Sequence, residues 1–352
     1  MTKQEQRLLA VDAVRGVAAL AVVLYHAPRE LRSAVGIHPW LDAIFANGYL
    51  GVDSFFVLSG FVITMSVASS SWTFSYLLRF IARRSVRLDP SYWAAIGLEL
   101  LLGYVGFHIL QDEYPFPSTA GVVSHLVYLQ GVLGYPQISD VFWTLCFEIQ
   151  FYLILVGLLV VSNLHLVKTR LSQRVVLGTA LTIIAVTSVA VRNGAIQNPH
   201  EGIGLIRAYQ FAVGVVTFLA AKGKTPVSMA AFFCGAILMA RLLDGAVAEV
   251  CVTALTVGVC FGSIVSVRIN ALADVSPLQF LGRISYSLYL YHASIVGRAS
   301  TLSLLLAKKA GLAFLPILGL VGSVFGSIAF AYLMFRLIER PTMRLSKRIR
   351  ME

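Results

Sequence analysis

The first apolar segment of the chain carries ionisable side chains at a helical spacing. Arg15 and His26 lie about three helical turns apart, so on a helix they share one face with a rise of about 16.5 Å between them. Asp12 lies one turn before Arg15 and is expected to pair with it. Charged groups inside a membrane are costly and are functional candidates by default, so this face, with a guanidinium toward one side and an imidazole toward the other, is a candidate functional site. The simpler alternative is a snorkelling arginine and a histidine that caps the helix end.

Two carboxylates stand near the starts of later apolar segments. Asp53, in GVDSFFVLSGF, enters its segment from the same side as His26. Thr144, Glu148 and Tyr152 are spaced four residues apart and form one stripe of a helix. A buried carboxylate must be paired or protonated, and His26 is the nearest partner by depth. A pair of Glu148 and His26 would fix the tautomer of the imidazole, whereas an arginine partner for Glu148 that serves packing alone is the alternative.

A third polar set lies in LGRISYSLYLYH, residues 281–292. On a helix Ser285, Tyr289 and His292 share one face. With Trp143 and Thr144 they are candidates for the lining of a pocket that holds a polar ligand. An aromatic belt at the membrane interface would give a similar pattern.

A basic segment, IARRSVRLDPSYW, covers residues 81–93. Arg84 and Arg87 are three residues apart, so a helix can present both guanidinium groups to one anion, and Arg79 and Arg83 add to the positive charge. Topogenic charge with binding of anionic lipid is the alternative, and it needs no further ligand.

The composition identifies the elements that must position these residues. Hydrophobic residues make up 58% of the 352 residues, charged residues only 13%, and the mean hydropathy is +0.80. A soluble fold cannot bury this much apolar surface, so a cytosolic globular enzyme, a disordered chain and a disulfide scaffold are excluded. The four cysteines lie inside apolar runs and have no zinc-pair spacing, so we expect no metal site.

The apolar runs predict an all-α integral membrane protein with about ten transmembrane helices. The segment 68–89 between the second and third spans is amphipathic and is expected to lie at the interface, and the proline-containing loop 112–140 to hold little helix. The expected spans cover residues 8–27, 47–67, 90–111, 141–163, 173–192, 203–221, 227–243, 247–267, 280–298 and 311–338.

The lysines and arginines predict the orientation of these spans. With both termini in the cytoplasm, 19 basic residues lie on the inner side and eight on the outer side, which fits the positive-inside rule. The net charge of +11 is therefore explained by topology, and no nucleic-acid partner is expected. This orientation puts Arg84 and Arg87 in the cytoplasm and His26 near the outer face.

Five blocks of residues, taken in order, resemble those of the membrane acyltransferase 3 family of the O-antigen acetylase type. The Glu339-Arg340-Pro341 sequence after the last expected span is similar to that of the family as well. The blocks are Arg15-x10-His26, GVDSFFVLSG at 51–60, Arg84-x-x-Arg87 before PSYW at 90–93, WTLCFE at 143–148 and GRISYSLYLYH at 282–292.

The resemblance implies an O-acyltransferase in the bacterial cytoplasmic membrane. Some members of the family carry a second, extracytoplasmic domain, whereas we expect residues 1–352 to form one transmembrane domain with no appended soluble domain, because the chain stops shortly after its last expected span. The resemblance also implies acetyl-CoA as the cytoplasmic donor, membrane lipids as surroundings, and a carbohydrate or glycolipid acceptor at the outer face. Arg84 and Arg87 would hold the phosphates of CoA, and Arg15 the inner pyrophosphate or the upper pantetheine. His26 would act on the acceptor hydroxyl as a general base or through a covalent acyl-His intermediate. Glu148 or Asp53 would orient His26, as a carboxylate orients the histidine of a triad, and the polar pocket would hold donor or acceptor.

The main alternative is a proton-coupled secondary transporter of a small polar solute. Asp53, Glu148 and His26 would then form a proton relay. This class would show Gly- or Pro-broken spans in corresponding halves of the chain and no dependence on CoA. A membrane partner that only binds lipid would leave the shared face of Arg15 and His26 unexplained.

Overall fold

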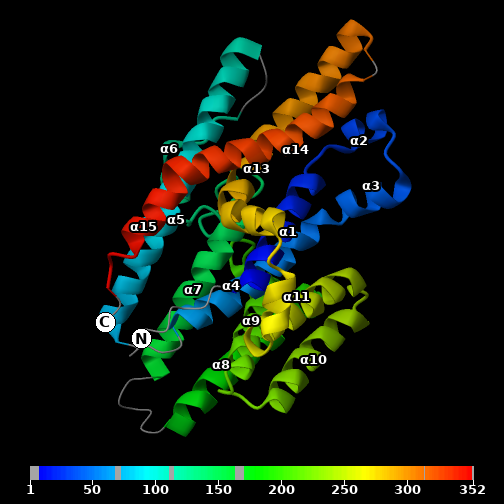
Figure 1. Ribbon diagram of the computed structural model, residues 1–352. Helices are drawn as coiled ribbons and strands as arrows, with labels where there is room; N and C mark the ends of the chain where they lie inside the picture. The colour runs from blue at the N-terminus through cyan, green and yellow to red at the C-terminus, as the bar shows by residue number, and fades with distance from the viewer. Residues whose placement is uncertain (1–7, 68–72, 111–114, 163–169, 313, 351–352) are drawn as a thin grey trace.

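The computed structural model describes residues 8–67, 73–110, 115–162, 170–312 and 314–350, and every regular element in these ranges is a helix. This confirms the all-α prediction (Figure 1). Short 3-10 helices cover Gly48–Leu50 (η1) and Gly204–Arg207 (η3), and π-helical turns cover Gly106–Leu110 (η2) and Phe335–Glu339 (η4). The α-helices are α1 Leu9–Tyr25, α2 Arg29–Val35, α3 Pro39–Ala46, α4 Gly51–Val67, α5 Phe74–Val105, α6 Thr119–Leu126, α7 Trp143–Ser162, α8 Arg170–Arg192, α9 Ala208–Ala221, α10 Val227–Leu243, α11 Val247–Val265, α12 Val267–Leu272, α13 Ser276–Ala310, α14 Leu315–Met334 and α15 Arg340–Ser346.

Six stretches of helix within the described ranges are long and apolar enough to cross a membrane, or seven if the bent pair α1–α2 forms one span. The multi-pass membrane architecture is therefore clear, while the count of about ten stays a prediction. The remaining expected spans coincide with α5, α10 and α13. Of these, α10 has only 17 residues, and α5 and α13 mix charged with apolar side chains. The six stretches are Pro39–Val67, Trp143–Ser162, Val175–Arg192, Gly204–Ala221, Val247–Val265 and Leu315–Ser346.

The basic segment before the third expected span does not form a separate interfacial helix. From Phe74 onward it belongs to α5, which continues through Pro90 to Val105, while residues 68–72 lie outside the described ranges. Leucine and arginine favour helix, and the helix continues although Pro90 cannot donate a backbone hydrogen bond between the basic and the apolar part. The expected loop 112–140 contains the short helix α6, whose first turn is capped by Ser118 through the backbone N–H of Gly121 at 3.1 Å.

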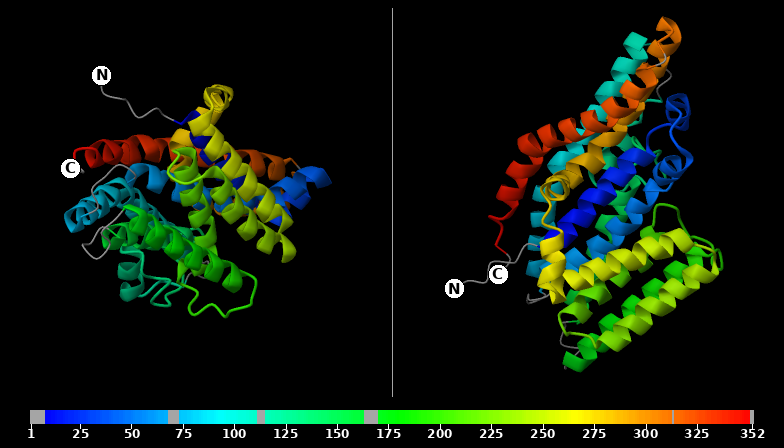
Figure 2. Two further views of the ribbon diagram at one scale, coloured as in Figure 1. Left: turned by 90° about the horizontal axis from the view of Figure 1, so that it is seen from below. Right: turned by 45° about the vertical axis from the view of Figure 1, so that its right-hand side comes forward.

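Small residues let α1 approach the helices around it. Gly16 and Gly282 bring α1 and α13 into backbone contact, and a Cβ added at Gly282 would collide with the carbonyl of Asp12. Close approach at small residues is typical of membrane helix pairs, where apolar burial against lipid gives no driving force. Figures 1 and 2 show α1 and α4 in the middle of the molecule, with the α13–α14 pair on one side and α8 to α11 on the other. The polar residues of α1 therefore face neighbouring helices.

Candidate active site

A cavity of about 100 Å³ brings together residues from α1, α4, α5, α7 and α13 and from the π-turn η4. Its lining includes three arginines and two carboxylates, which leaves one positive charge in excess when all five groups are ionised. Among the residues expected from the sequence, the lining holds Arg15, Arg84, Arg87, Glu148, Thr144, Ser285 and Tyr289. The structure thus joins the predicted anion-binding arginines, which are up to 72 residues apart in the chain, at one place.

The guanidinium of Arg84 is fixed by aromatic rings. Its Cζ lies 4.7 Å from the ring centre of Tyr152 and 5.7 Å from that of Phe80, both within the range of cation–π attraction. Planar stacking of this kind leaves the edge of the guanidinium free to donate hydrogen bonds to an anion. Tyr152, one turn after Glu148 on α7, was expected on the polar stripe and does face the cavity.

The two carboxylates of the cavity are held by hydroxyl groups. Ser59 donates to Glu148 at 2.6 Å, and its oxygen lies 2.6 Å from the hydroxyl of Tyr152. Glu339 accepts from the hydroxyl of Ser287 at 2.6 Å and from the backbone N–H of the same residue at 3.2 Å. Glu148 and Glu339 are therefore counter-charges to the arginines that line the same cavity.

The opposite part of the cavity lining consists of hydroxyl groups. The hydroxyl of Thr144 lies 2.9 Å from the carbonyl oxygen of Val141 and 2.8 Å from the hydroxyl of Tyr289, with which it shares a hydrogen bond. Ser285 donates to the carbonyl of Gly282 at 3.0 Å. The ring of Tyr289 lies 5.8 Å from that of His292, which links the cavity to the histidines.

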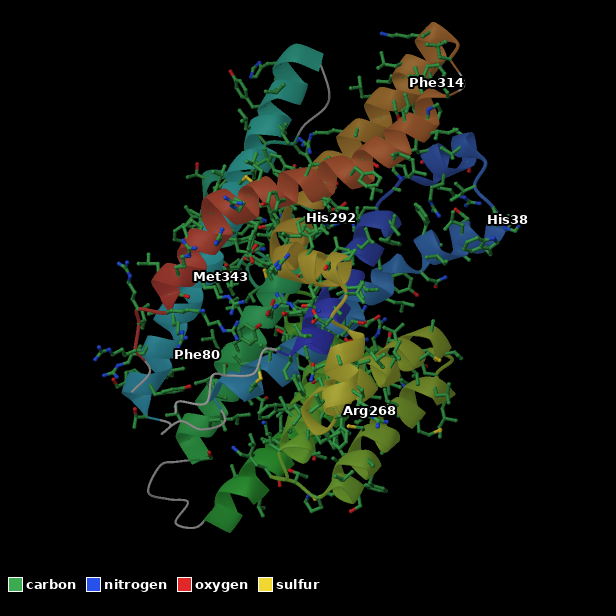
Figure 3. The ribbon with its side chains drawn as sticks, viewed as in Figure 1. His38, Phe80, Arg268, His292, Phe314 and Met343 are labelled. Carbon is green, nitrogen blue, oxygen red and sulfur yellow. The ribbon has the colours of Figure 1, made fainter. Side chains whose placement is uncertain are left out.

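His26 and His292 form a pair. Nδ1 of His26 lies 3.2 Å from Nε2 of His292 and 2.9 Å from the carbonyl oxygen of Val22, and the two ring centres are 4.8 Å apart. His292 is fully buried and lies near the centre of the molecule (Figure 3). Among the described residues the hydrogen-bonding neighbour of His26 across helices is His292, while Glu148 lies with the arginines.

Asp53 lies in a different charged cluster. It accepts from Arg207 at 2.5 Å and from Gln210 at 2.7 Å. Arg207 also lies 3.6 Å from Glu249, to which the hydroxyl of Tyr209 donates. The cluster joins α4, η3, α9 and α11, and no contact in the described residues brings Asp53 to His26. The expectation that Asp53 orients His26 therefore gains no geometric support.

Trp143 lines a second, larger cavity of about 640 Å³ between the loop after α6 and the loop before η3. Tyr135, Gln137, His200 and Glu201 also line it. Gln150 ties α7 to the loop before η3, because its amide donates to the carbonyl of Gly202 at 2.7 Å and accepts the N–H of Gly204 at 2.9 Å. Trp143 packs edge-on against Phe147 at 5.3 Å.

Sequence reasoning missed two groups at the first cavity. Glu339 follows the last apolar run, where a charge is easily read as part of the cytoplasmic flank, although it is 5% exposed. Ser59 stands in the block at 51–60, but a serine in an apolar helix gives no signal until its partner is known. Arg207 and Gln210, the partners of Asp53, could not be identified because both lie about 150 residues away in the chain.

Comparisons with known proteins agree with the resemblance found in the sequence. A family model described as an acyltransferase domain matches residues 8–336. The exopolysaccharide production protein ExoZ of Rhizobium meliloti is 27% identical over 85% of this chain and 91% of its own length. BcsY of Komagataeibacter xylinus, whose name assigns it provisionally to the membrane-bound transacylases, is 28% identical over 80% of this chain and 71% of its own.

The peptidoglycan O-acetyltransferase OatA of Listeria monocytogenes is 25% identical over 94% of this chain. The match spans 55% of the length of that relative. No solved structure matches the chain significantly.

Proposed function

The chain belongs to this acyltransferase family and is a membrane O-acyltransferase, and we propose that it moves an acetyl group from cytoplasmic acetyl-CoA to a carbohydrate hydroxyl at the outer face. The observation that carries the donor assignment is the convergence of Arg15, Arg84 and Arg87 on one cavity. Phosphate groups are the ligands that arginine clusters bind best. Arg84 and Arg87 would hold the phosphates of CoA, and Arg15 the start of the pantetheine arm.

The proposed reaction needs one base and no further reactant. Nε2 of His26 takes the proton of the acceptor hydroxyl while the hydroxyl oxygen attacks the thioester carbonyl carbon. The C–S bond then breaks, and the CoA thiolate takes up the proton from His26 as it leaves. In the acyl-His alternative the same nitrogen attacks the thioester first, and the acceptor oxygen displaces it in a second step.

The second cavity supports a carbohydrate acceptor. Sugars present both C–H faces, which pack on aromatic rings, and hydroxyl groups, which need hydrogen-bonding partners. Tyr135 and Trp143 supply rings, and Gln137, His200 and Glu201 supply polar groups. Trp143 directly precedes Thr144, which lines the first cavity, so the two cavities are neighbours along α7. The names of ExoZ and OatA, which refer to an exopolysaccharide and to peptidoglycan, agree with this acceptor class.

The proposal includes a location and an orientation. About ten spans with both termini in the cytoplasm would put Arg84 at the inner side of a bacterial cytoplasmic membrane, and the second cavity at the outer side. The bias of basic residues supports this orientation. The membership of the family does not favour the transporter alternative.

Substitution of the arginines tests the donor site. Arg84→Ala and Arg87→Ala should each raise the Kd for acetyl-CoA, by roughly 10-fold or more, because each removes charge-assisted hydrogen bonds to phosphate. Arg→Lys at either position should restore only part of the affinity, since an ammonium lacks the planar fork. Arg79→Ala is the matched control, because Arg79 lies on the same helix but is exposed.

A truncated donor separates phosphate binding from a structural role. An acetyl-pantetheine thioester has no nucleotide, so its affinity should change much less in the Arg84→Ala and Arg87→Ala proteins. Equal losses of affinity for both donors would contradict the assignment of these arginines to the phosphates of CoA.

A further inference from the structure

The hydrogen bonds of His292 determine which of its ring nitrogens carries the proton. Nδ1 lies 2.8 Å from the carbonyl oxygen of Tyr289 and 3.1 Å from that of Leu288. Carbonyl oxygens only accept hydrogen bonds, so Nδ1 of His292 must be the N–H. In the neutral ring Nε2 then carries a lone pair and acts as an acceptor. Burial favours the neutral ring, and no carboxylate contacts His292 among the described residues.

The same argument extends to His26. Its Nδ1 faces two acceptors, the carbonyl oxygen of Val22 at 2.9 Å and the Nε2 lone pair of His292 at 3.2 Å. Nδ1 of His26 must therefore carry its proton and share it between them. Nε2 of His26 is left unprotonated, and it makes no hydrogen bond within the described part of the chain.

We propose that His292 is the positioning residue of His26: its lone pair holds the Nδ1–H of His26 and leaves Nε2 of His26 as the reacting nitrogen. The role of the pair in the reaction rests on the proposed function. The hydrogen bonding and the positions of the protons do not depend on it. A carboxylate holds the histidine in the familiar catalytic triads. Here a neutral imidazole takes that position, and Glu148 remains with the arginines of the cavity.

The arrangement also explains how the pair would respond to proton transfer. When Nε2 of His26 accepts a proton, the ring becomes an imidazolium and its Nδ1–H becomes a stronger donor. The bond to His292 then becomes charge-assisted, so the interaction is stronger after proton transfer than before it. Stabilisation of this kind lowers the barrier rather than only tightening binding. The backbone contact of α1 and α13 at Gly16 and Gly282 supports the distance between the two rings.

Two substitutions at His292 test the proposal. Glutamine can accept the Nδ1–H of His26 through its side-chain oxygen and donate to the carbonyl of Tyr289, whereas phenylalanine fills the space but accepts nothing. Tyr291→Phe is the matched control, because it removes the hydrogen bond from Tyr291 to the carbonyl of Ser91 at 2.8 Å on the same helix, away from His26.

The full-length protein in lipid nanodiscs would be assayed for release of free CoA from acetyl-CoA, with water as the acceptor. His292→Phe should lower kcat by roughly 10- to 100-fold with little change in the KM for acetyl-CoA, because only the orientation of the base is lost. His292→Gln should stay within a few-fold of the wild-type kcat, and Tyr291→Phe should match the wild type. Wild-type kcat in a folded His292→Phe protein, or equal losses in the Phe and Gln proteins, would overturn the proposal.

A spectroscopic measurement makes the test independent of activity. The nitrogen NMR spectrum of protein labelled with ¹⁵N-histidine should show His26 and His292 each with a protonated Nδ1 and an unprotonated Nε2, and the two are assigned from His26→Ala and His292→Gln proteins. A proton on Nε2 of His26 would refute the proposal, even if His292→Phe does not fold. If the wild type shows the expected tautomers but turns over no acetyl-CoA, the proposed function fails instead.

Discussion

A substitution of His26 should affect the rate of acyl transfer and leave the binding of acetyl-CoA nearly unchanged. His26 does not line the cavity that holds Arg15, Arg84 and Arg87. His26→Ala should therefore lower acyl transfer by at least about 100-fold, the usual contribution of a general base, and leave the Kd for acetyl-CoA nearly unchanged. His38→Ala is the control, since His38 is exposed at the start of α3. Wild-type turnover by a folded His26→Ala protein would exclude the catalytic role.

Glu148 should act on the donor site rather than on the imidazole. It shares a cavity with three arginines and is held by Ser59. Glu148→Gln removes a negative charge from a site proposed to bind an anion, so the Kd for acetyl-CoA should fall by roughly three- to tenfold. Titration of the purified protein with acetyl-CoA measures this change. An unchanged Kd together with a large loss of kcat would instead support the role of Glu148 in orienting His26.

The sequence predicts these residues better than it predicts their partners. The helical period is enough to place Arg15 and His26 on one face and to put Tyr289 and His292 on another. It says nothing about which faces meet, because that depends on the packing of α1 against α13. His292 was expected only to line a pocket, and the structure brings it to His26 at 3.2 Å. Glu148 was expected beside His26 only because both lie at a similar depth in the membrane. Residues on any two helices of the bundle can lie at the same depth without being in contact.

At the scale of elements, the charged cluster around Asp53 joins α4 to helices that do not line the first cavity. Its ion pairs and hydrogen bonds join α4 to η3, α9 and α11, and Arg192 extends it to α8 through Glu249 at 3.1 Å. Asp53 is 1% exposed, so its charge depends on these partners. The cluster therefore holds the α8 to α11 group against the centre of the molecule.

Asp53→Ala tests whether this residue is structural. It leaves Arg207, whose side chain is 13% exposed, with Glu249 at 3.6 Å as its remaining carboxylate, which should cost about 1–3 kcal/mol of stability. The expected result is a lower unfolding temperature. At temperatures where the variant is still folded, its turnover per folded molecule should be close to that of the wild type. Asp244→Ala is the control, because Asp244 pairs with Arg241 at a more exposed position and should cost at most about 1 kcal/mol. A stable but inactive Asp53→Ala protein would restore Asp53 as a catalytic candidate.

Hydropathy locates the helices of this protein more reliably than it gives their lengths. A helix occurs at each of the ten expected positions, but α5 begins at Phe74 and α13 continues to Ala310. The added part of α5 carries four arginines, and the added part of α13 mixes leucines with serines and ends in Lys308 and Lys309, so hydropathy does not mark where these helices begin and end. Local helix propensity and contacts with other helices determine where these helices end. For α13 the C-terminal end is a left-handed Gly311, which a glycine adopts without strain.

For the whole molecule, the distribution of charge predicts which side each substrate reaches. In the proposed orientation, nineteen basic residues lie on the inner side against eight on the outer side, and Arg84 would face the cytoplasm. The loops that form the second cavity then face outward. Proteins with one introduced cysteine test this orientation in a Cys251→Ser background, because Cys251 is exposed and the three cysteines that remain are buried. In intact right-side-out vesicles, an impermeant thiol reagent should label a Pro115→Cys protein and should label an Arg79→Cys protein only after the membrane is opened.

The same vesicles test the path of the acyl group. Tyr289 lines the cavity proposed to bind the donor, and its ring lies 5.8 Å from that of His292. In the proposed route the acetyl group would pass from this cavity to the histidine pair while the nucleotide stays on the inner side. Acetyl-CoA loaded inside the vesicles should therefore acylate an external oligosaccharide, and acetyl-CoA added outside should not, because the bilayer blocks CoA. His26→Ala vesicles control for leakage of the donor. Acylation by external but not by internal acetyl-CoA would show that the orientation, or the route through the protein, is the reverse of the one argued here.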